Sequence, residues 1–277
     1  MTLLPLPDPY DFELSTERFR AFGRDIANLW NEGGVHRVVG GREIRIEGSR
    51  GGVDVEPLDD ETKPVARAIV GADFELDPFY AWAEGDELLR ELVPRLAGLR
   101  PPLAPDPYEA LVSAISAQQV SLFAAFAIRN RMIERFGTRV GRAWAFPTRA
   151  RLAAADPQEL TALGFSRRKA DYVVTLARSD LDLAGLSALE EDEVRAQLVA
   201  LPGIGEWTAD WFLARHLASP RAWPAGDLAL RKAVSAFYFG GRKLPIAEMR
   251  KAGARFNPFQ NLTAHYLLTG FRTAPPA

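Results

Sequence analysis

The sequence predicts a mainly α-helical protein with an α+β domain at its N-terminus, which contains an antiparallel sheet. Two short apolar runs surround Gly40-Gly41, a pattern typical of a β-hairpin. Four prolines follow at 101, 102, 105 and 107, and nearly every segment after them has apolar residues at helical spacing. The chain has 277 residues, of which 47% are apolar, so it can bury a sizeable core without disulfide or metal cross-links.

The first hundred residues contain both the alternating apolar pattern of strands and the apolar spacing of helices. Val35–Val39 and Arg42–Glu47 form the expected hairpin, and Val53 and Val55 indicate a further strand. Helices are expected from a cap at Ser15 or Thr16 through Leu29, and over Pro64–Val70.

The proline cluster within Leu99–Pro107 predicts a domain boundary, because proline ends both helices and strands. We therefore expect an α+β domain over residues 1–98 and a helical domain over residues 99–220. Residues 221–277, together with 99–106, are expected to complete a cleft. Helices are predicted over Tyr108–Phe136, Arg149–Ala155, Asp156–Leu163, Lys169–Ser179, Glu190–Ala200, Trp207–Leu217, Leu228–Phe239, Pro245–Ala254 and Asn261–Thr269.

Composition excludes several classes of protein. The chain has no cysteine, which rules out disulfides, thiolate zinc sites and iron–sulfur clusters on thiolates, and which favours the cytoplasm. No apolar run approaches the roughly 18 residues of a membrane span, so no membrane partner is expected. Met1–Tyr10 lacks the basic and apolar regions of a secretory signal.

The net charge of −2 hides an uneven distribution. Residues 1–100 hold 12 Lys or Arg and 20 Asp or Glu, giving −8, whereas residues 101–277 hold 22 and 16, giving +6. A basic C-terminal part is able to bind a polyanion, although charge alone fits a solvated basic surface equally well.

The most informative segment is Leu201–Ala209, which reads Leu-Pro-Gly-Ile-Gly-Glu-Trp-Thr-Ala between two predicted helices. Glycine allows positive φ and close approach of another backbone, and the start of the second helix directs backbone N–H groups at an anion. Two glycines in an interhelical turn are common by themselves. The full pattern, with helices on both sides, favours a hairpin that grips a DNA phosphate without reading sequence.

This segment resembles the helix–hairpin–helix of the DNA glycosylase superfamily that is named for the hairpin and for a Gly-Pro-Asp region after it. Asp227, in Trp223–Leu228, matches the essential aspartate about twenty residues beyond the hairpin. Leu201–Ala209, Arg151–Pro157 and Leu163-Gly164 resemble the bacterial inducible 3-methyladenine glycosylase II in particular. The resemblance covers most of residues 105–270 and, more weakly, the N-terminal part.

The resemblance implies roles for individual residues. Asp227 is the expected catalytic residue, since a carboxylate near the sugar stabilises the positive charge that develops there or orients a water. Members of the superfamily that also cut the DNA backbone carry a lysine at the position of Trp207, so Trp207 predicts hydrolysis without lyase activity.

The remaining site residues fall into three groups. A base pocket is expected from Trp207, Trp211, Gln118 and Phe259, with Trp211 equally readable as a core residue. DNA contacts are expected from Gly203, Ile204, Gly205, Thr208 and Gln119. Gln119 stands where the family has an apolar wedge, and Phe259 stands where it has a pocket tryptophan. A monovalent cation, Na⁺ or K⁺, is implied on the backbone carbonyls of Val199, Leu201 and Ile204, and no other cofactor is expected.

The expected function is hydrolytic removal of alkylated purines, such as 3-methyladenine and 7-methylguanine, from double-stranded DNA by a monomer. Two alternatives stay open: a glycosylase for a deaminated or oxidised base, and a non-catalytic damage-binding module. The three histidines, His36, His216 and His265, are interpreted as structural because none has a partner at ligand spacing.

Overall fold

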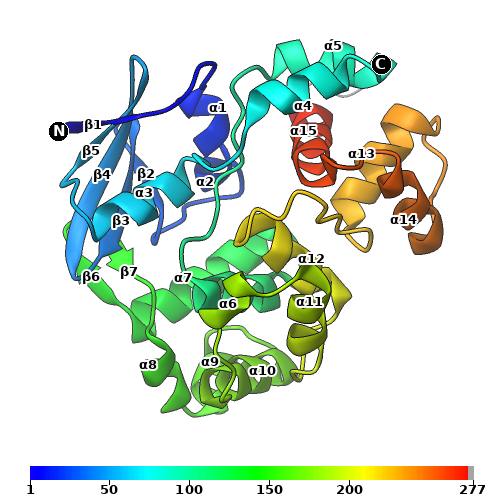
Figure 1. The fold of residues 1–277 in the computed structure, drawn as a ribbon. Coiled ribbons are helices and arrows are strands. Elements are labelled where there is room, and N and C mark those ends of the chain that lie inside the picture. The colour runs from blue at the N-terminus through cyan, green and yellow to red at the C-terminus, as the bar shows by residue number, and fades with distance from the viewer. Residues whose placement is uncertain (274–277) are drawn as a thin grey trace.

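A computed structural model describes residues 1–273 and contains three packed units (Figure 1). The N-terminal sheet, in blue, lies beside a central group of helices drawn in green and yellow. A third group combines the cyan helices α4 and α5 with the orange and red helices α13 to α15. Each unit has its own cluster of buried apolar side chains.

The N-terminal sheet has the strand order β1-β5-β4-β3-β2, and all neighbouring strands are antiparallel. Its strands are β1 (Thr2–Pro5), β2 (Leu29–Asn31), β3 (Gly34–Val39), β4 (Arg42–Ser49) and β5 (Gly52–Glu56). Gly40 and Gly41 both have positive φ, 54° and 75°, which matches the tight turn of the predicted hairpin. Ile44 and Ile46 are fully buried in the core of this unit, to which helix α3 (Thr62–Ile69) also contributes.

The predicted helix from Ser15 or Thr16 through Leu29 is wrong. The chain forms only α1 (Phe12–Thr16) and α2 (Arg18–Ala21) before Gly23 takes a φ of 104°. Asp25 then accepts hydrogen bonds from the backbone of Ala27 and Asn28, and Leu29 pairs with His36 in the sheet. The apolar residues of this segment are spaced as in a helix, but they pack in two different cores: Phe19 in that of the sheet and Ile26 in that of the central helices.

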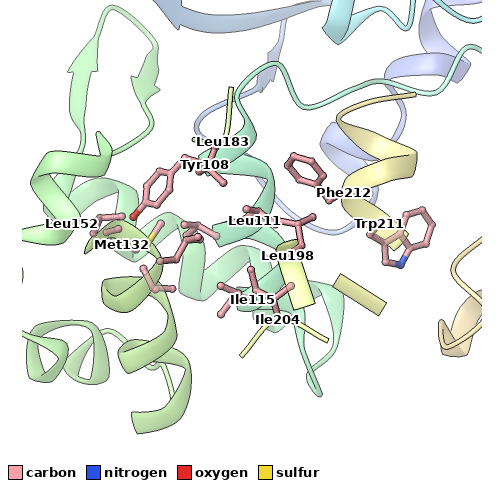
Figure 2. Packing of buried hydrophobic residues seen from close by; sticks show 14 of the residues in the cluster. Tyr108, Leu111, Ile115, Met132, Leu152, Leu183, Leu198, Ile204, Trp211 and Phe212 are labelled. Atoms are coloured by element: carbon pink, nitrogen blue, oxygen red, sulfur yellow. The ribbon is translucent and has the colours of Figure 1, made fainter. Parts of the chain in front are cut away.

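The central unit contains most of the predicted helices. They are α6 (Pro107–Ala117), α7 (Leu122–Phe136), α8 (Arg149–Ala153), α9 (Pro157–Ala162), α10 (Arg167–Arg178), α11 (Glu191–Val199) and α12 (Glu206–Arg215), with a short 3-10 helix at Gly185–Ala188 and a small hairpin of β6 (Thr138–Val140) and β7 (Ala143–Ala145). Figure 2 shows Leu111, Ile115 and Leu198 in this core, with Trp211 at its margin on α12.

One predicted helix, Tyr108–Phe136, is broken into α6 and α7. Gln119 has a φ of 54°, which a helix does not allow, and the Ser121 side chain caps α7 by accepting a hydrogen bond from the Ala124 amide at 3.2 Å. The break leaves Gln119 exposed in the connection between the two helices.

The third unit corrects the predicted boundary at residue 98. Helices α4 (Leu76–Ala83) and α5 (Glu87–Arg95) share one core with α13 (Leu228–Tyr238), α14 (Ile246–Ala254) and α15 (Gln260–Thr273). Tyr266 is fully buried there, and its hydroxyl donates to the Leu99 carbonyl at 3.1 Å. Residues before and after the central unit therefore pack together, which a boundary read along the sequence does not reveal.

A buried ion pair joins the sheet to the central helices. Arg37 of β3 donates to Glu109 of α6 at 2.6 Å, and both side chains are more than nine-tenths buried. Within residues 1–273, none of the helices combines the length and apolar character needed to cross a membrane.

Candidate active site

The turn between α11 and α12 has two glycines with different surroundings. Gly203 has a φ of 82°, and a Cβ atom there would lie 2.1 Å from the Tyr172 ring. A Cβ at Gly205 would meet nothing within 4 Å. Gly205 occupies the N-cap of α12 and offers no side chain to the free amides of the first turn. The first glycine is therefore needed for packing, whereas the second leaves the helix end open to an anion.

Neighbouring helices hold this hairpin in place. The Gln118 amide donates to the Gly203 carbonyl at 2.8 Å and to the Thr208 hydroxyl at 3.2 Å. Arg195 of α11 pairs with Asp210 of α12 at 3.0 Å. Burial raises the pKa of Asp210, and the Arg195 guanidinium opposes that rise.

Asp227 is the N-cap of α13 and accepts hydrogen bonds at both carboxylate oxygens. Oδ1 accepts from the Leu230 amide at 2.9 Å. Oδ2 accepts from the indole N–H of Trp207 at 2.9 Å and from that of Trp211 at 3.0 Å. The carboxylate is thus fixed by the helix that follows it and by the helix of the hairpin.

Asp227 lines a cavity of about 350 Å³, within the range of small-molecule sites. The walls come from all three units of the fold: α1–α2 and the loop after them, residues 99–105, α6, the start of α7, α12, the start of α13 and α15. The hairpin helix and the Asp227 helix therefore form only one side of the cavity, because the N-terminal unit and α15 form other walls.

A group of basic side chains lies in the same cavity. The Arg215 guanidinium is stacked 3.7 Å above the Trp211 ring, and His265 meets that ring at its edge with centroids 5.8 Å apart. Burial, reinforced by the Arg18 guanidinium, lowers the pKa of Arg215 well below its usual value, while Asp227 opposes this. Burial also lowers the pKa of Arg18 to about 10.

The structure brings together Asp227, Trp207 and Trp211 of the predicted site. Trp211 is buried and has Arg215 on its ring, so Trp207, which is half-buried, is the ring that faces the cavity more openly. Gln119 is exposed at the connection that leads to the cavity residue Leu122.

Two residues predicted for the base pocket lie elsewhere. Phe259 is half-buried and packs against Phe79 and Trp82 beside the core of the third unit. Gln118 uses its amide to hold the hairpin, as described above, and does not belong to the cavity lining among residues 1–273.

The sequence did not indicate Arg18, Arg215 or Arg272 as residues of the cavity, and His265 was interpreted only as structural. One signal was available for Arg215, since residues 207, 211 and 215 follow at steps of four and share a helix face. Arg18 carried no such signal, because only tertiary packing brings α2 to the cavity.

The carbonyls implied as cation ligands belong to the end of α11 and to the turn that follows it. Val199 ends α11, and Leu201 and Ile204 belong to the hairpin, where the Leu201 carbonyl accepts from the Ile204 amide at 3.2 Å. Within residues 1–273 there is no cluster of three or more His, Cys, Asp or Glu side chains that could hold a metal ion.

Comparisons with known proteins identify the family of this chain. Residues 112–258 match the model of the HhH-GPD superfamily of base excision DNA repair proteins. A DNA-3-methyladenine glycosylase of Bacillus subtilis is 29% identical over 203 residues, which cover 70% of this chain and 67% of that protein. The DNA-3-methyladenine glycosylase 2 of Escherichia coli is 33% identical over 172 residues, which cover 59% of this chain and 57% of that protein.

A solved structure extends the similarity to the whole chain. The 3-methyladenine DNA-glycosylase of Archaeoglobus fulgidus superposes with a TM-score of 0.89 at 27% identity and covers 99% of each chain. The match includes the N-terminal sheet as well as the helices. The predicted resemblance is confirmed, and the chain belongs to the HhH-GPD superfamily of base excision DNA repair proteins.

Proposed function

We propose that this protein is a DNA glycosylase that hydrolyses the bond between an alkylated purine and its deoxyribose, leaving an abasic site. The observation that carries the proposal is the Asp227 carboxylate, fixed by three N–H donors at the wall of the cavity. The names of the relatives in Bacillus subtilis and Escherichia coli support the same substrate class.

The proposed reaction takes place at C1′ of the sugar. The C1′–N bond breaks and its electron pair leaves with the base, while positive charge grows on the sugar and is stabilised by the Asp227 carboxylate. A water oxygen then bonds to C1′, and its proton passes to Asp227. A purine alkylated at N3 or N7 carries positive charge beforehand, so it leaves as a neutral base.

The pocket offers Trp207 as the stacking surface for such a base. A cation over an indole ring gains roughly 0.5–2 kcal/mol. Trp211 also donates to Asp227, but its ring is covered by Arg215 and does not offer a stacking surface.

We propose hydrolysis without lyase activity. A lyase needs an amine that attacks C1′, and position 207 is a tryptophan. The residues that line the cavity, taken over the described part of the chain, include arginines but no lysine. Lys169 donates instead to the Ser116 carbonyl at 3.0 Å.

Two surfaces are proposed to hold double-stranded DNA. The open start of α12, with Gly203, Ile204, Gly205 and Thr208, would bind a backbone phosphate, with a monovalent cation on the nearby carbonyls. The connection around Gln119 would enter the duplex where the base has left the stack. Apolar side chains follow it, and the most exposed is Phe123, at 63%. Apolar wedges of this kind fill gaps between base steps.

The test is to incubate methylated duplex DNA with the wild-type protein and identify the released bases. We expect 3-methyladenine and 7-methylguanine, and no release by Asp227→Asn. Asp210→Asn is the matched control, since Asp210 pairs with Arg195 rather than lining the cavity. Full activity of Asp227→Asn would exclude the mechanism, and DNA binding with no released base would indicate a damage-binding module.

Lyase activity is tested by borohydride reduction during the reaction. A covalent protein–DNA complex would overturn the hydrolytic proposal. Lys169→Met would then show whether that lysine supplies the amine.

A further inference from the structure

The first turns of α13 present an exposed face for which the proposed hydrolysis gives no role. Leu230, Ala233 and Val234 are buried in the core of the third unit. Leu228 and Lys232, four residues apart, lie on the opposite side of the helix, where both are exposed. The exposed face of α13 therefore combines one apolar and one basic side chain.

Leu228 lies beside the cavity and not inside it. It directly follows Asp227, and its side chain is 62% exposed. Asp227 and Ala229 line the cavity, whereas Leu228 does not belong to the lining. Its side chain is therefore on the protein surface next to the place of the proposed reaction.

Lys232 carries a charge that no described residue neutralises. Its ammonium group forms no ion pair and no hydrogen bond with any residue among 1–273. Residues 221–277 hold nine Lys or Arg against two Asp or Glu. Of the two carboxylates, Asp227 accepts from its N–H donors and Glu248 pairs with Arg242 at 2.6 Å. The exposed face of α13 is therefore positively charged and complements a polyanionic strand.

The proposed reaction fixes where the damaged strand must run. Adjacent residues have Cα atoms about 3.8 Å apart, so a sugar in contact with Asp227 brings the neighbouring nucleotides of its strand to Leu228. Lys232 lies about 6 Å further along the helix axis. Because the phosphates of one strand repeat every 3.4 Å or so along a duplex, the face spans about two nucleotides.

We propose that this face binds the damaged strand next to the extruded nucleotide, with Leu228 packed on a deoxyribose and Lys232 in contact with a phosphate. The inference deepens the proposed function and rests on it, because the contact between the sugar and Asp227 places the strand. It adds a third DNA contact to the start of α12 and the connection around Gln119. Contacts to sugar and phosphate position a protein on DNA without reading its sequence.

The experiment measures binding to a duplex with one abasic site, which requires no catalysis, at several salt concentrations. Lys232→Met should lower the slope of log affinity against log salt by about 0.9, the value for one phosphate contact, whereas Lys232→Arg should keep the slope. Leu228→Ala should weaken binding by about tenfold without a change in slope, since it loses an apolar contact.

Single methylphosphonates along the damaged strand then locate the contact, since each removes the charge of one phosphate. We expect one position, within about two nucleotides of the abasic site, at which a methylphosphonate weakens binding by the wild type but not by Lys232→Met. The matched controls are Lys63→Met in α3 and Leu3→Ala on β1. Both residues are exposed and belong to the N-terminal unit, so these variants should bind as the wild type does.

Other outcomes separate the two proposals. Release of alkylated purines by the wild type, with unchanged binding by Lys232→Met and Leu228→Ala, would overturn the inference and leave the proposed function standing. Equal losses in the control variants would also overturn the inference, because the effect would then not belong to α13. Weaker binding by the α13 variants, with no base released by the wild type, would contradict the proposed hydrolysis and retain the DNA contact.

Discussion

The indole N–H of Trp207 donates to Asp227 Oδ2 at 2.9 Å, so a residue of the hairpin helix positions the carboxylate twenty residues further along the chain. Trp211, one turn later on α12, donates to the same oxygen at 3.0 Å. Two hydrogen bonds from the hairpin helix of the central unit therefore hold the proposed catalytic residue, which caps α13 of the third unit. In the proposed complex, α12 would set the distance between a phosphate at its start and a sugar at Asp227.

The two tryptophans are expected to contribute differently. Trp211→Phe removes a donor to Asp227 and should slow single-turnover excision by between about 10- and 100-fold, because a displaced carboxylate loses its alignment. Its effect on binding should be small, since Trp211 is buried. Trp207→Phe should also weaken binding of the damaged duplex, because its ring is the proposed stacking surface.

The control for these variants is Trp223→Phe. The Trp223 indole N–H donates to the Met249 carbonyl in the third unit and not to Asp227. An equal loss of rate in this variant would show that the tryptophans act through stability alone.

Substitutions at the two hairpin glycines are expected to have opposite effects on stability and on DNA binding. Gly203→Ala should lower the free energy of unfolding by roughly 1–3 kcal/mol, because of its positive φ and the clash with Tyr172. Gly205→Glu should leave stability nearly unchanged, since its Cβ meets open space, and should weaken binding to all DNA sequences. Urea unfolding and binding titrations at fixed salt measure the two effects.

Gly205→Gln is the matched control for charge. It should retain more affinity than Gly205→Glu if an anion binds at the start of α12. Equal affinity of the two variants, or a loss confined to one DNA sequence, would count against a phosphate contact.

Phe123 is expected to contribute to binding and little to folding. The side chain is 63% exposed and touches Phe22 edge-on with ring centroids 6.1 Å apart. Stacking on a base is worth about 1–3 kcal/mol per aromatic, so Phe123→Ala should weaken binding of an abasic-site duplex by tenfold or more. Leu3→Ala, on the edge strand β1, should have no such effect. Unchanged affinity in Phe123→Ala would remove this residue from the proposed interface.

The stability of the protein is expected to fall as the pH drops below about 6.5. Burial, reinforced by Arg215, Arg18 and Arg272, lowers the pKa of His265 well below its ordinary value of 6.5, and burial also lowers the pKa of His216. The unfolded chain then binds protons that the folded chain does not. The free energy of unfolding should decrease by up to about 1.4 kcal/mol per pH unit for each histidine.

Urea titrations at several pH values between 7 and 5 measure this slope. The carboxyl group of Asp25 does not interfere, because its lowered pKa places its contribution below pH 3.8. His265→Gln should reduce the slope and His216→Gln should reduce it separately. An unchanged slope in His265→Gln would show that this histidine is protonated in the folded protein.

The sequence by itself determined the features that depend on neighbouring residues. The hairpin at Gly40-Gly41 follows from turn chemistry, and most helices after residue 106 follow from apolar spacing and caps. The sequence also predicted the hairpin with Gly203 and Gly205 and the catalytic role of Asp227. Their spacing along the chain is fixed by one helix and one loop, so the pattern is visible without the tertiary structure. The predicted family rested on these local patterns.

Only the tertiary structure decided what depends on distant packing. It separated Tyr108–Phe136 into two helices at Gln119, placed α4 and α5 with α13 to α15, and packed Phe259 against the third core, away from the cavity. It also brought Arg18 from the N-terminal unit to face Arg215 and Asp227. Spacing along a chain fixes which residues share a helix face, whereas the walls of a cavity between three units are fixed by how their cores pack.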